Sequence, residues 1–306
     1  MRPERVASSH DMKAAAFEYS RPGDVEEACA LLAGEDGARI IAGGQTLVPM
    51  MAMRLSRPTR LVDIGRIAAL SFIREDADGV CIGATTRQCV VEHDPLVAAR
   101  VPLLAAVIPW IGHAATRARG TIGGSLANAD PAAELVLIAI TLDATLKIRD
   151  TIGCQDILAS DFFIGPMITT LPAASCLTGV CFPAWREGRI GVGFHEVSAR
   201  RSDFASVSVA AQVAIDESGV CRRIAVGIGA ATDVPIRLAS VERALAGTHV
   251  AAADLPAMVT EAMAGVETLS DLHASADYRR RVAASLAVRA IEDALTMANA
   301  RDRHAR

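Results

Sequence analysis

Two short segments, each with a pair of adjacent glycines, constrain this chain more than any other feature. They read Ala42-Gly43-Gly44-Gln45-Thr46 and Thr121-Ile122-Gly123-Gly124-Ser125. Paired glycines let a backbone adopt positive φ and approach a ligand without a Cβ clash, and consecutive N–H groups in such a turn form a concave site for an anion. A helix that starts nearby adds free N–H donors. Together the segments predict two loops that close on one diphosphate group.

Other phosphate-binding and catalytic motifs are missing from the sequence. It contains no G-x-x-x-x-G-K-[ST] motif of a nucleoside-triphosphate P-loop. Gly227-Ile228-Gly229 resembles the start of a dinucleotide fingerprint, but Thr232 stands where the third glycine belongs and Pro235 lies within the expected helix. Neither a G-x-S-x-G elbow nor an H-E-x-x-H pair is present. The sequence thus indicates a cofactor cradle without an acid, base and nucleophile set.

The composition excludes several classes of protein. Of the 306 residues, 51% are apolar and 22% are charged, which argues against intrinsic disorder. Only 4% are aromatic and the net charge is −4, so we expect no nucleic-acid partner. The apolar run at residues 135–142 is far shorter than the ~20 residues of a membrane span. Because the N-terminus lacks a secretory signal pattern, we expect a cytoplasmic protein.

The cysteines give no sign of a metal site. There are seven, an odd number, and no two have C-x-x-C spacing. This pattern argues against a structural zinc site or an iron–sulfur cluster held by this chain alone. We expect most of the cysteines to be small core hydrophobes. They stand at positions 29, 81, 89, 154, 176, 181 and 221.

The hydrophobic pattern predicts a mixture of helices and strands. Asp24 fits a helix N-cap, with Glu27 three residues later. Asp78-Gly79 is typical of a hairpin turn, and Asp130-Pro131 predicts the start of a helix through Thr141. A helical pattern also covers residues 96–111. Long β runs then occupy residues 175–182, 189–197, 205–216 and 221–229, and helices are predicted at 236–246, 252–264 and about 276–300.

The change of pattern near residue 176 predicts two domains. Residues 1–11 are polar, and we expect them to be a disordered extension. Residues 12–175 would form a cofactor-binding domain, with subdomains at about 12–66 and 67–175. Residues 176–306 would form a C-terminal domain of antiparallel sheet plus helices.

Several strings of residues match one family in order along the chain. They closely resemble the FAD-binding (medium) subunit of molybdenum hydroxylases, the family that includes aerobic carbon monoxide dehydrogenase and xanthine dehydrogenase. The resemblance runs from about residue 13 to 295. The strings lie at residues 42–49, 61–64, 82–86, 119–134, 161–163, 193–196 and 200–205.

The resemblance implies an α+β fold and a cofactor site. The fold is a two-subdomain FAD-binding fold of the vanillyl-alcohol-oxidase type, followed by the C-terminal sheet-and-helix domain. The glycine segments would hold the FAD diphosphate and ribityl chain, Glu134 matches an acidic residue that contacts the cofactor, and His195 falls where some members have a Tyr near the flavin ring. The residues expected to bind the cofactor are Ala42, Gly43, Gly44, Gln45, Thr46, Leu47, Thr85, Ile111, Thr121, Ile122, Gly123, Gly124, Ser125, Asp130, Glu134 and His195.

The few aromatic residues are concentrated in one part of the chain. Six of the eleven fall within a stretch of 43 residues that crosses the predicted domain boundary. The resemblance implies that the flavin ring lies near this junction, so we expect some of the six to line it. They are Phe162, Phe163, Phe182, Trp185, Phe194 and Phe204.

The resemblance also implies a function within a larger complex. A large subunit with molybdopterin would hydroxylate the substrate, and a small subunit would pass electrons through [2Fe–2S] clusters. FAD in this chain would deliver them to an external acceptor, in a heterotrimer or its dimer. Two alternatives stay open: a stand-alone flavin-dependent oxidase or reductase of the same superfamily, and a scaffold subunit whose site has decayed. The intact glycines at 43, 44, 123 and 124 argue against the scaffold.

Overall fold

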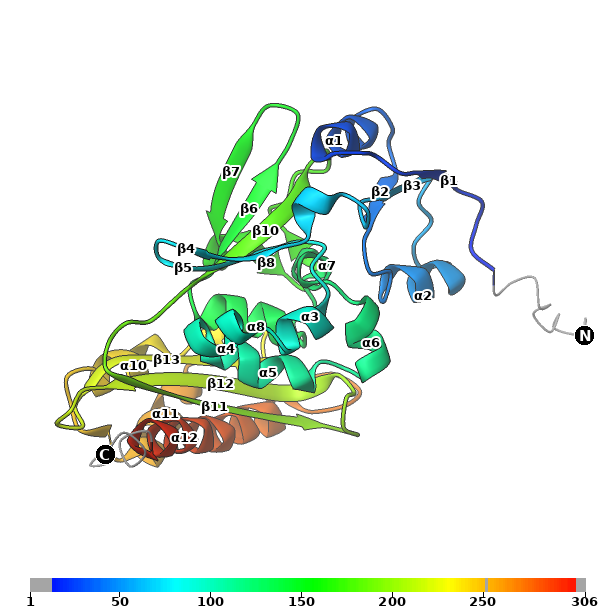
Figure 1. The fold of residues 1–306 in the computed structure, drawn as a ribbon. Helices are drawn as coiled ribbons and strands as arrows, with labels where there is room; N and C mark the ends of the chain where they lie inside the picture. Colours follow the sequence, from blue (N-terminus) through cyan, green and yellow to red (C-terminus); the bar gives the residue numbers. More distant parts are fainter. Residues whose placement is uncertain (1–12, 251–252, 301–306) are drawn as a thin grey trace, which may run out of the picture.

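The computed structural model describes residues 13–250 and 253–300 (Figure 1). Residues 1–11, for which we expect a disordered extension, lie outside the described residues. The described chain forms an α+β fold with three larger sheets and one short hairpin of β8 (Phe163–Gly165) and β9 (Ile168–Thr169). None of the described helices combines the length and the hydrophobicity that crossing a bilayer requires.

The first sheet is small and its strands are parallel. Its order is β1 (Glu18–Ser20), β3 (Arg60–Asp63), β2 (Ala38–Ile41). Helix α1 (Val25–Ala33) packs on it, and α2 (Leu47–Ala52) follows β2. The predicted N-cap is confirmed, because the Asp24 carboxylate accepts a hydrogen bond from the Glu27 N–H at 2.8 Å.

The second sheet corrects the predicted domain boundary. Its order is β4 (Ile73–Asp76), β5 (Gly79–Gly83), β10 (Cys176–Pro183), β6 (Thr145–Arg149), β7 (Cys154–Leu158). The predicted hairpin turn at Asp78-Gly79 joins β4 to β5. Strand β10 lies in the centre of this sheet, whereas the sequence pattern assigned residues from 176 onward to the next domain. The sheet of the first domain therefore extends to Pro183. The sequence pattern missed this because the pairing of strands that are far apart in the chain is not encoded in the local order of residues.

A layer of short helices separates the second sheet from the third (Figure 1). Pro102 follows the non-helical Val101, so the helix predicted at residues 96–111 is divided into shorter pieces. Asp130 accepts from the Ala132 N–H at 2.9 Å and forms a turn, so α8 begins at Glu134 and not at Pro131. The helices are α3 (Gln88–Glu92), α4 (Pro95–Arg100), α5 (Pro102–Val107), η2 (Ile108–Trp110), α6 (Ala114–Arg119), α7 (Ile122–Asn128) and α8 (Glu134–Thr141).

The third sheet confirms the long β runs. Strands β11 (Arg189–Ser198), β12 (Ala205–Ile215), β13 (Cys221–Gly229) and β14 (Ile236–Arg237) form one antiparallel sheet in this order. The last of these occupies the start of the helix predicted at 236–246, so α10 covers only Ala239–Leu245. One face packs against α12 (Ala276–Ala300), which is the long helix predicted at about 276–300, and α11 (Leu255–Ala264) packs on α12. The other face packs against α5 and α8 (Figure 1).

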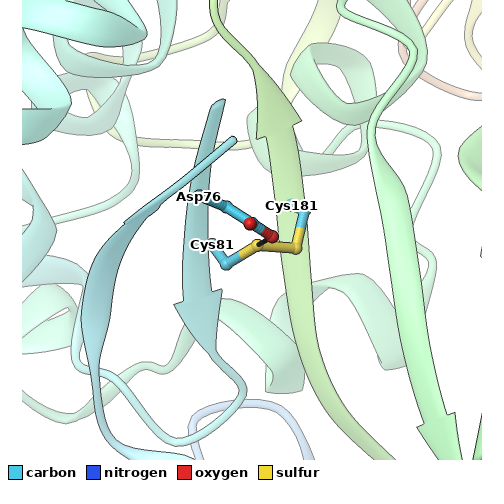
Figure 2. A group of neighbouring side chains, drawn as sticks. All are labelled: Asp76, Cys81 and Cys181. Atoms are coloured by element: carbon cyan, nitrogen blue, oxygen red, sulfur yellow. Dashed lines mark hydrogen bonds between the residues drawn. A yellow bond between two sulfur atoms is a disulfide. The ribbon is translucent and has the colours of Figure 1, made fainter. Parts of the chain in front are cut away.

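The cysteines depart in part from the expectation. Cys29, Cys176 and Cys221 are buried core residues as predicted. Cys81 on β5 and Cys181 on β10 are directly opposite each other in the ladder and form a disulfide. Figure 2 shows the Asp76 carboxylate pointing at this bond. The expectation was wrong for this pair because their 100-residue separation hides a contact that only the sheet order creates.

Candidate cofactor site

The two glycine segments lie side by side at the wall of one cavity of about 530 Å³. A Cβ on Gly43 would lie 2.4 Å from the carbonyl oxygen of Arg119, so the first segment touches the chain directly before the second. The volume falls in the range of small-molecule and cofactor sites. The predicted residues that line the cavity are Ala42, Gly43, Gly44, Gln45, Thr46, Leu47, Ile111, Thr121, Gly123, Gly124, Ser125, Asp130 and Glu134.

The first glycine segment is a loop with free backbone donors. It connects β2 to α2, and Gly44 has a φ of +70°, which residues with a Cβ rarely adopt. Among the hydrogen bonds of the described residues, none uses the N–H groups of Gly43, Gly44, Gln45 or Thr46. Free N–H groups beside a cavity suit an anion such as a diphosphate.

The second glycine segment is a helix start and not a loop. Thr121 has an extended backbone, and its Oγ1 accepts from the Gly124 N–H at 3.1 Å, so both glycines lie in the first turn of α7. The Gly123 N–H donates to the Ala84 carbonyl at 2.9 Å. A Cβ on Gly123 would lie 2.4 Å from the Ala84 Cβ. These N–H groups are therefore occupied, and Gly123 allows α7 to pack closely against the end of β5.

The charged residues of the cavity wall are mostly acidic. They are Arg39, Asp130, Glu134 and Asp203. A wall with three carboxyl groups and one guanidinium gives a phosphate group little cationic help, so backbone donors are the stronger candidates. Burial, with the nearby charges of Glu196 and Asp130, raises the pKa of Glu134 to about 7.

Three predicted residues do not line the cavity: Thr85, Ile122 and His195. Thr85 and Ile122 are buried in the packing behind it. His195 lies on the side of β11 that faces α12, where its Nε2 contacts Asp293 Oδ2 at 2.8 Å. The placement of His195 near a cofactor is therefore corrected, because alternation along the strand turns its side chain away from the cavity.

The structure adds a wall from the C-terminal domain, of which the sequence analysis named only Phe204. Ser202, Asp203 and Phe204, between β11 and β12, line the cavity. Of the six clustered aromatic residues, Phe204 is the one that does so, whereas Phe162, Phe163 and Phe182 are buried in the core. These three residues belong to the string at 200–205 that supports the family resemblance, and this string was the sequence signal that could have identified them as lining residues. The other unselected lining residues are Arg39, Ile40, Ile41, Ile64, Ala84, Gln88, Gly112, Thr116, Gly120, Ala127, Asn128, Ala133, Leu171, Cys176 and Leu177.

Both parts of the chain match known protein families. Residues 15–185 match the family described as "FAD binding domain in molybdopterin dehydrogenase". Residues 193–294 match the "CO dehydrogenase flavoprotein C-terminal domain". The two matched regions agree with the two parts of the fold, since β10 falls within the first and the sheet from β11 onward within the second.

Individual relatives are similar over nearly their whole length. The chain is 35% identical to the "6-hydroxypseudooxynicotine dehydrogenase complex subunit alpha" of Paenarthrobacter nicotinovorans, covering 93% of this chain and 96% of the relative. A solved carbon monoxide dehydrogenase from Hydrogenophaga pseudoflava superposes with a TM-score of 0.89 at 31% identity, covering 94% of this chain and 99% of the other. Quinoline 2-oxidoreductase from Pseudomonas putida 86 gives 0.88 at 34% identity, with coverage of 94% and 99%. The chain therefore belongs to the family of FAD-binding medium subunits of molybdenum-dependent hydroxylases and dehydrogenases.

Proposed function

We propose that this chain holds FAD in the described cavity and passes electrons from the [2Fe–2S] clusters of a partner subunit to an external acceptor. One observation carries the placement: the unused N–H groups of residues 43–46 line the cavity wall. Two adjacent phosphates carry two negative charges, and a turn of free N–H donors binds such a group without a lysine or arginine. Bound FAD would supply the electron chemistry, and the protein its position and polarity.

The residues divide into distinct roles in this proposal. Residues 42–47 hold the diphosphate, with Gly44 in the left-handed backbone conformation that the turn requires. Residues 121–125 fix α7 against β5 and form the adjacent wall. Asp130 and Glu134 lie at the start of α8, where a carboxyl group can bond to hydroxyl or ring nitrogen groups of the cofactor.

The partners in this proposal are a large molybdopterin subunit and a small [2Fe–2S] subunit. Support comes from the relatives, which are named as medium chains or as subunits of dehydrogenase complexes. A heterotrimer or its dimer is the expected assembly, and the cytoplasm is the expected location. The absence of an acid, base and nucleophile set in the sequence fits a subunit that transfers electrons and leaves the substrate chemistry to its partner.

Purification together with the two partner subunits tests this function. We expect the complex to contain FAD in an amount equal to this chain, and substrate to reduce that flavin only when molybdenum and iron are present. The measurements are flavin absorbance, metal content and the rate of flavin bleaching. A colourless chain that cannot be reconstituted with FAD would contradict the proposal. Turnover by this chain alone, without either metal, would instead identify a stand-alone flavin enzyme.

A further inference from the structure

A polar group interrupts the apolar face that the third sheet turns toward α8. Side chains alternate along β11, and Val192 and Phe194 pack into the core of the first domain. Glu196 is the next residue on the same face. It pairs directly with Ser208 on β12, just as Phe194 pairs with Ala210. The strand register therefore places a carboxyl and a hydroxyl group next to each other at the junction of the two domains.

Helix α8 brings Glu134 to the same place. A Cβ on Gly227 would meet Thr141, and one on Gly229 would meet Leu137 at 3.3 Å, so this face of α8 lies on β13. Glu134, Leu137 and Thr141 are spaced by three and four residues and share that face. Gly229 pairs with Ser208 in the ladder. Glu134, one turn before Leu137 on the same face of α8, lies near enough to Glu196 for that charge to act on it, and it also lines the cavity.

The polar atoms behind Glu134 have no partner in the described part of the chain. Ser208 is 1% exposed and its Oγ accepts and donates no hydrogen bond there. The Oε2 of Glu196 is likewise buried and unbonded. Buried polar groups are normally hydrogen-bonded, and an unsatisfied charged group is the most costly case. Burial without a hydrogen-bond partner therefore favours the neutral, protonated form of a carboxyl group in this position over the charged form.

The surrounding charges favour the protonated state. Burial raises the pKa of Glu196 to about 7, and burial first and then the Glu196 and Asp130 charges raise that of Glu134 to about 7. Asp203 is a further carboxylate in the lining of the same cavity. On α12, Arg279 is occupied by the carbonyl oxygens of Ser206 and Ala230 and by Asp271. On the opposite face of β11, His195 contacts Asp293.

We propose that Glu196 is a positioning residue for the cofactor: from the neighbouring strand it favours the protonated form of the Glu134 carboxyl, in which Glu134 presents an O–H donor and no charge to the cavity. This inference rests on the proposed binding of FAD. A carboxylate at position 134 would repel a ligand with two negative charges and could only accept hydrogen bonds. The charge of Glu196 in turn favours the protonated form of Glu134.

The pH dependence of FAD affinity tests the pair. The full chain is stripped of flavin and titrated with FAD between pH 5.5 and 8.5, with binding measured by flavin fluorescence. We expect affinity to fall roughly tenfold as pH rises through 7, because Glu134 loses its proton beside an anionic ligand. In Glu196→Gln the neighbouring charge is lost, so the midpoint moves to lower pH by about one unit. In Glu134→Gln the side chain stays neutral, and affinity no longer depends on pH in this range.

Controls separate failure of this inference from failure of the proposed function. Glu292→Gln, an exposed carboxylate on α12, should keep the wild-type pH profile. Glu196→Asp should restore a raised midpoint because it keeps the charge. Superimposable profiles for wild type and Glu196→Gln, or an unchanged profile in Glu134→Gln, would overturn the inference. A wild-type chain that binds no FAD at any pH would overturn the proposed function instead.

Thermal unfolding of the flavin-free chain provides a second measurement. Carboxyl groups with a raised pKa keep protons in the folded state that the unfolded state releases between about pH 4.5 and 7. Stability from these groups is therefore greatest below pH 4.5 and falls as pH rises toward 7. We expect this fall to be smaller in Glu134→Gln and in Glu196→Gln. A fall of unchanged size in both variants would contradict the raised pKa values of these two carboxyl groups.

Discussion

Gly43→Val is expected to weaken FAD binding by about 10- to 100-fold while the chain stays folded. The new Cβ would lie 2.4 Å from the Arg119 carbonyl oxygen and 3.0 Å from the Gly120 Cα. Both contacts are with backbone, so the loop must move and its free N–H groups move with it. Overpacking of this kind costs about 1–3 kcal/mol, and each 1.4 kcal/mol or so is tenfold in affinity. Binding is measured by titrating the flavin-free variant with FAD.

Gly153→Val is the matched control for this substitution. No heavy atom lies within 4 Å of a Cβ built on Gly153, so the same chemical change should leave FAD affinity at the wild-type level. Circular dichroism of Gly43→Val checks that the variant is folded. If Gly43→Val binds FAD as tightly as Gly153→Val, the diphosphate does not lie on this loop.

The second glycine segment should respond differently to the same change. Gly123→Val should abolish flavin binding, and here the loss should accompany a lower melting temperature in the flavin-free chain. The reason is that a Cβ on Gly123 meets Ala84 at 2.4 Å inside the packing between α7 and β5. The two glycine pairs look alike in sequence, yet the first provides donors to the cavity and the second provides close packing.

Local signals in the sequence were sufficient for many elements. The cap at Asp24, the turn at Asp78-Gly79 and the strands β11 to β13 depend on neighbouring residues, and the structure confirms all of them. The family resemblance also predicted the overall fold and the cofactor, because several matching strings spread along the chain identify a family where no single motif can. The position of α8 was missed, since an Asp-Pro pair can begin a turn as well as a helix.

Contacts between distant segments could not be predicted from one sequence. The side chain of His195 turns toward α12 because strand alternation assigns Glu196 to the first-domain face, but both faces of β11 are at least partly buried. A shift of the strand by one residue would exchange the faces on which these two side chains lie. The alternation of polar and apolar residues in the sequence did not decide between the two arrangements. The same limit hid the central place of β10 and with it the Cys81–Cys181 disulfide.

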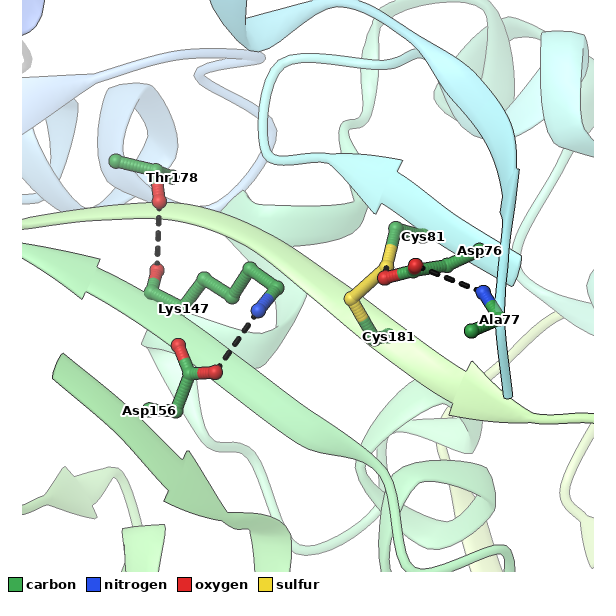
Figure 3. Close-up of a disulfide and its surroundings, with 7 residues drawn as sticks. All are labelled: Asp76, Ala77, Cys81, Lys147, Asp156, Thr178 and Cys181. Carbon is green, nitrogen blue, oxygen red and sulfur yellow. Dashed lines mark hydrogen bonds and ion pairs between the residues drawn. A yellow bond between two sulfur atoms is a disulfide. The ribbon is translucent and has the colours of Figure 1, made fainter. Parts of the chain in front are cut away.

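Removal of that disulfide is expected to lower the free energy of unfolding by about 2–4 kcal/mol. The bond closes a loop of 100 residues, which strongly restricts the unfolded chain. Figure 3 shows it near the end of β10, with Lys147 and Asp156 of β6 and β7 paired at 2.9 Å farther along the sheet. The measurement is denaturant unfolding of Cys81→Ala/Cys181→Ala, and of wild type with and without a thiol reductant. Cys154→Ser, which removes an exposed free thiol, serves as the control and should unfold like wild type.

The disulfide should also influence the cavity, because both strands that it joins continue into the cavity wall. Strand β5 ends just before Ala84, and β10 begins with Cys176 and Leu177, which line the cavity. Ala84 is in turn the surface on which Gly123 packs. Loss of the bond should therefore weaken FAD binding severalfold at a temperature where the chain is still folded. Equal FAD affinities for the double variant and wild type, measured by titration of the flavin-free chains, would show that the bond does not support the cavity wall.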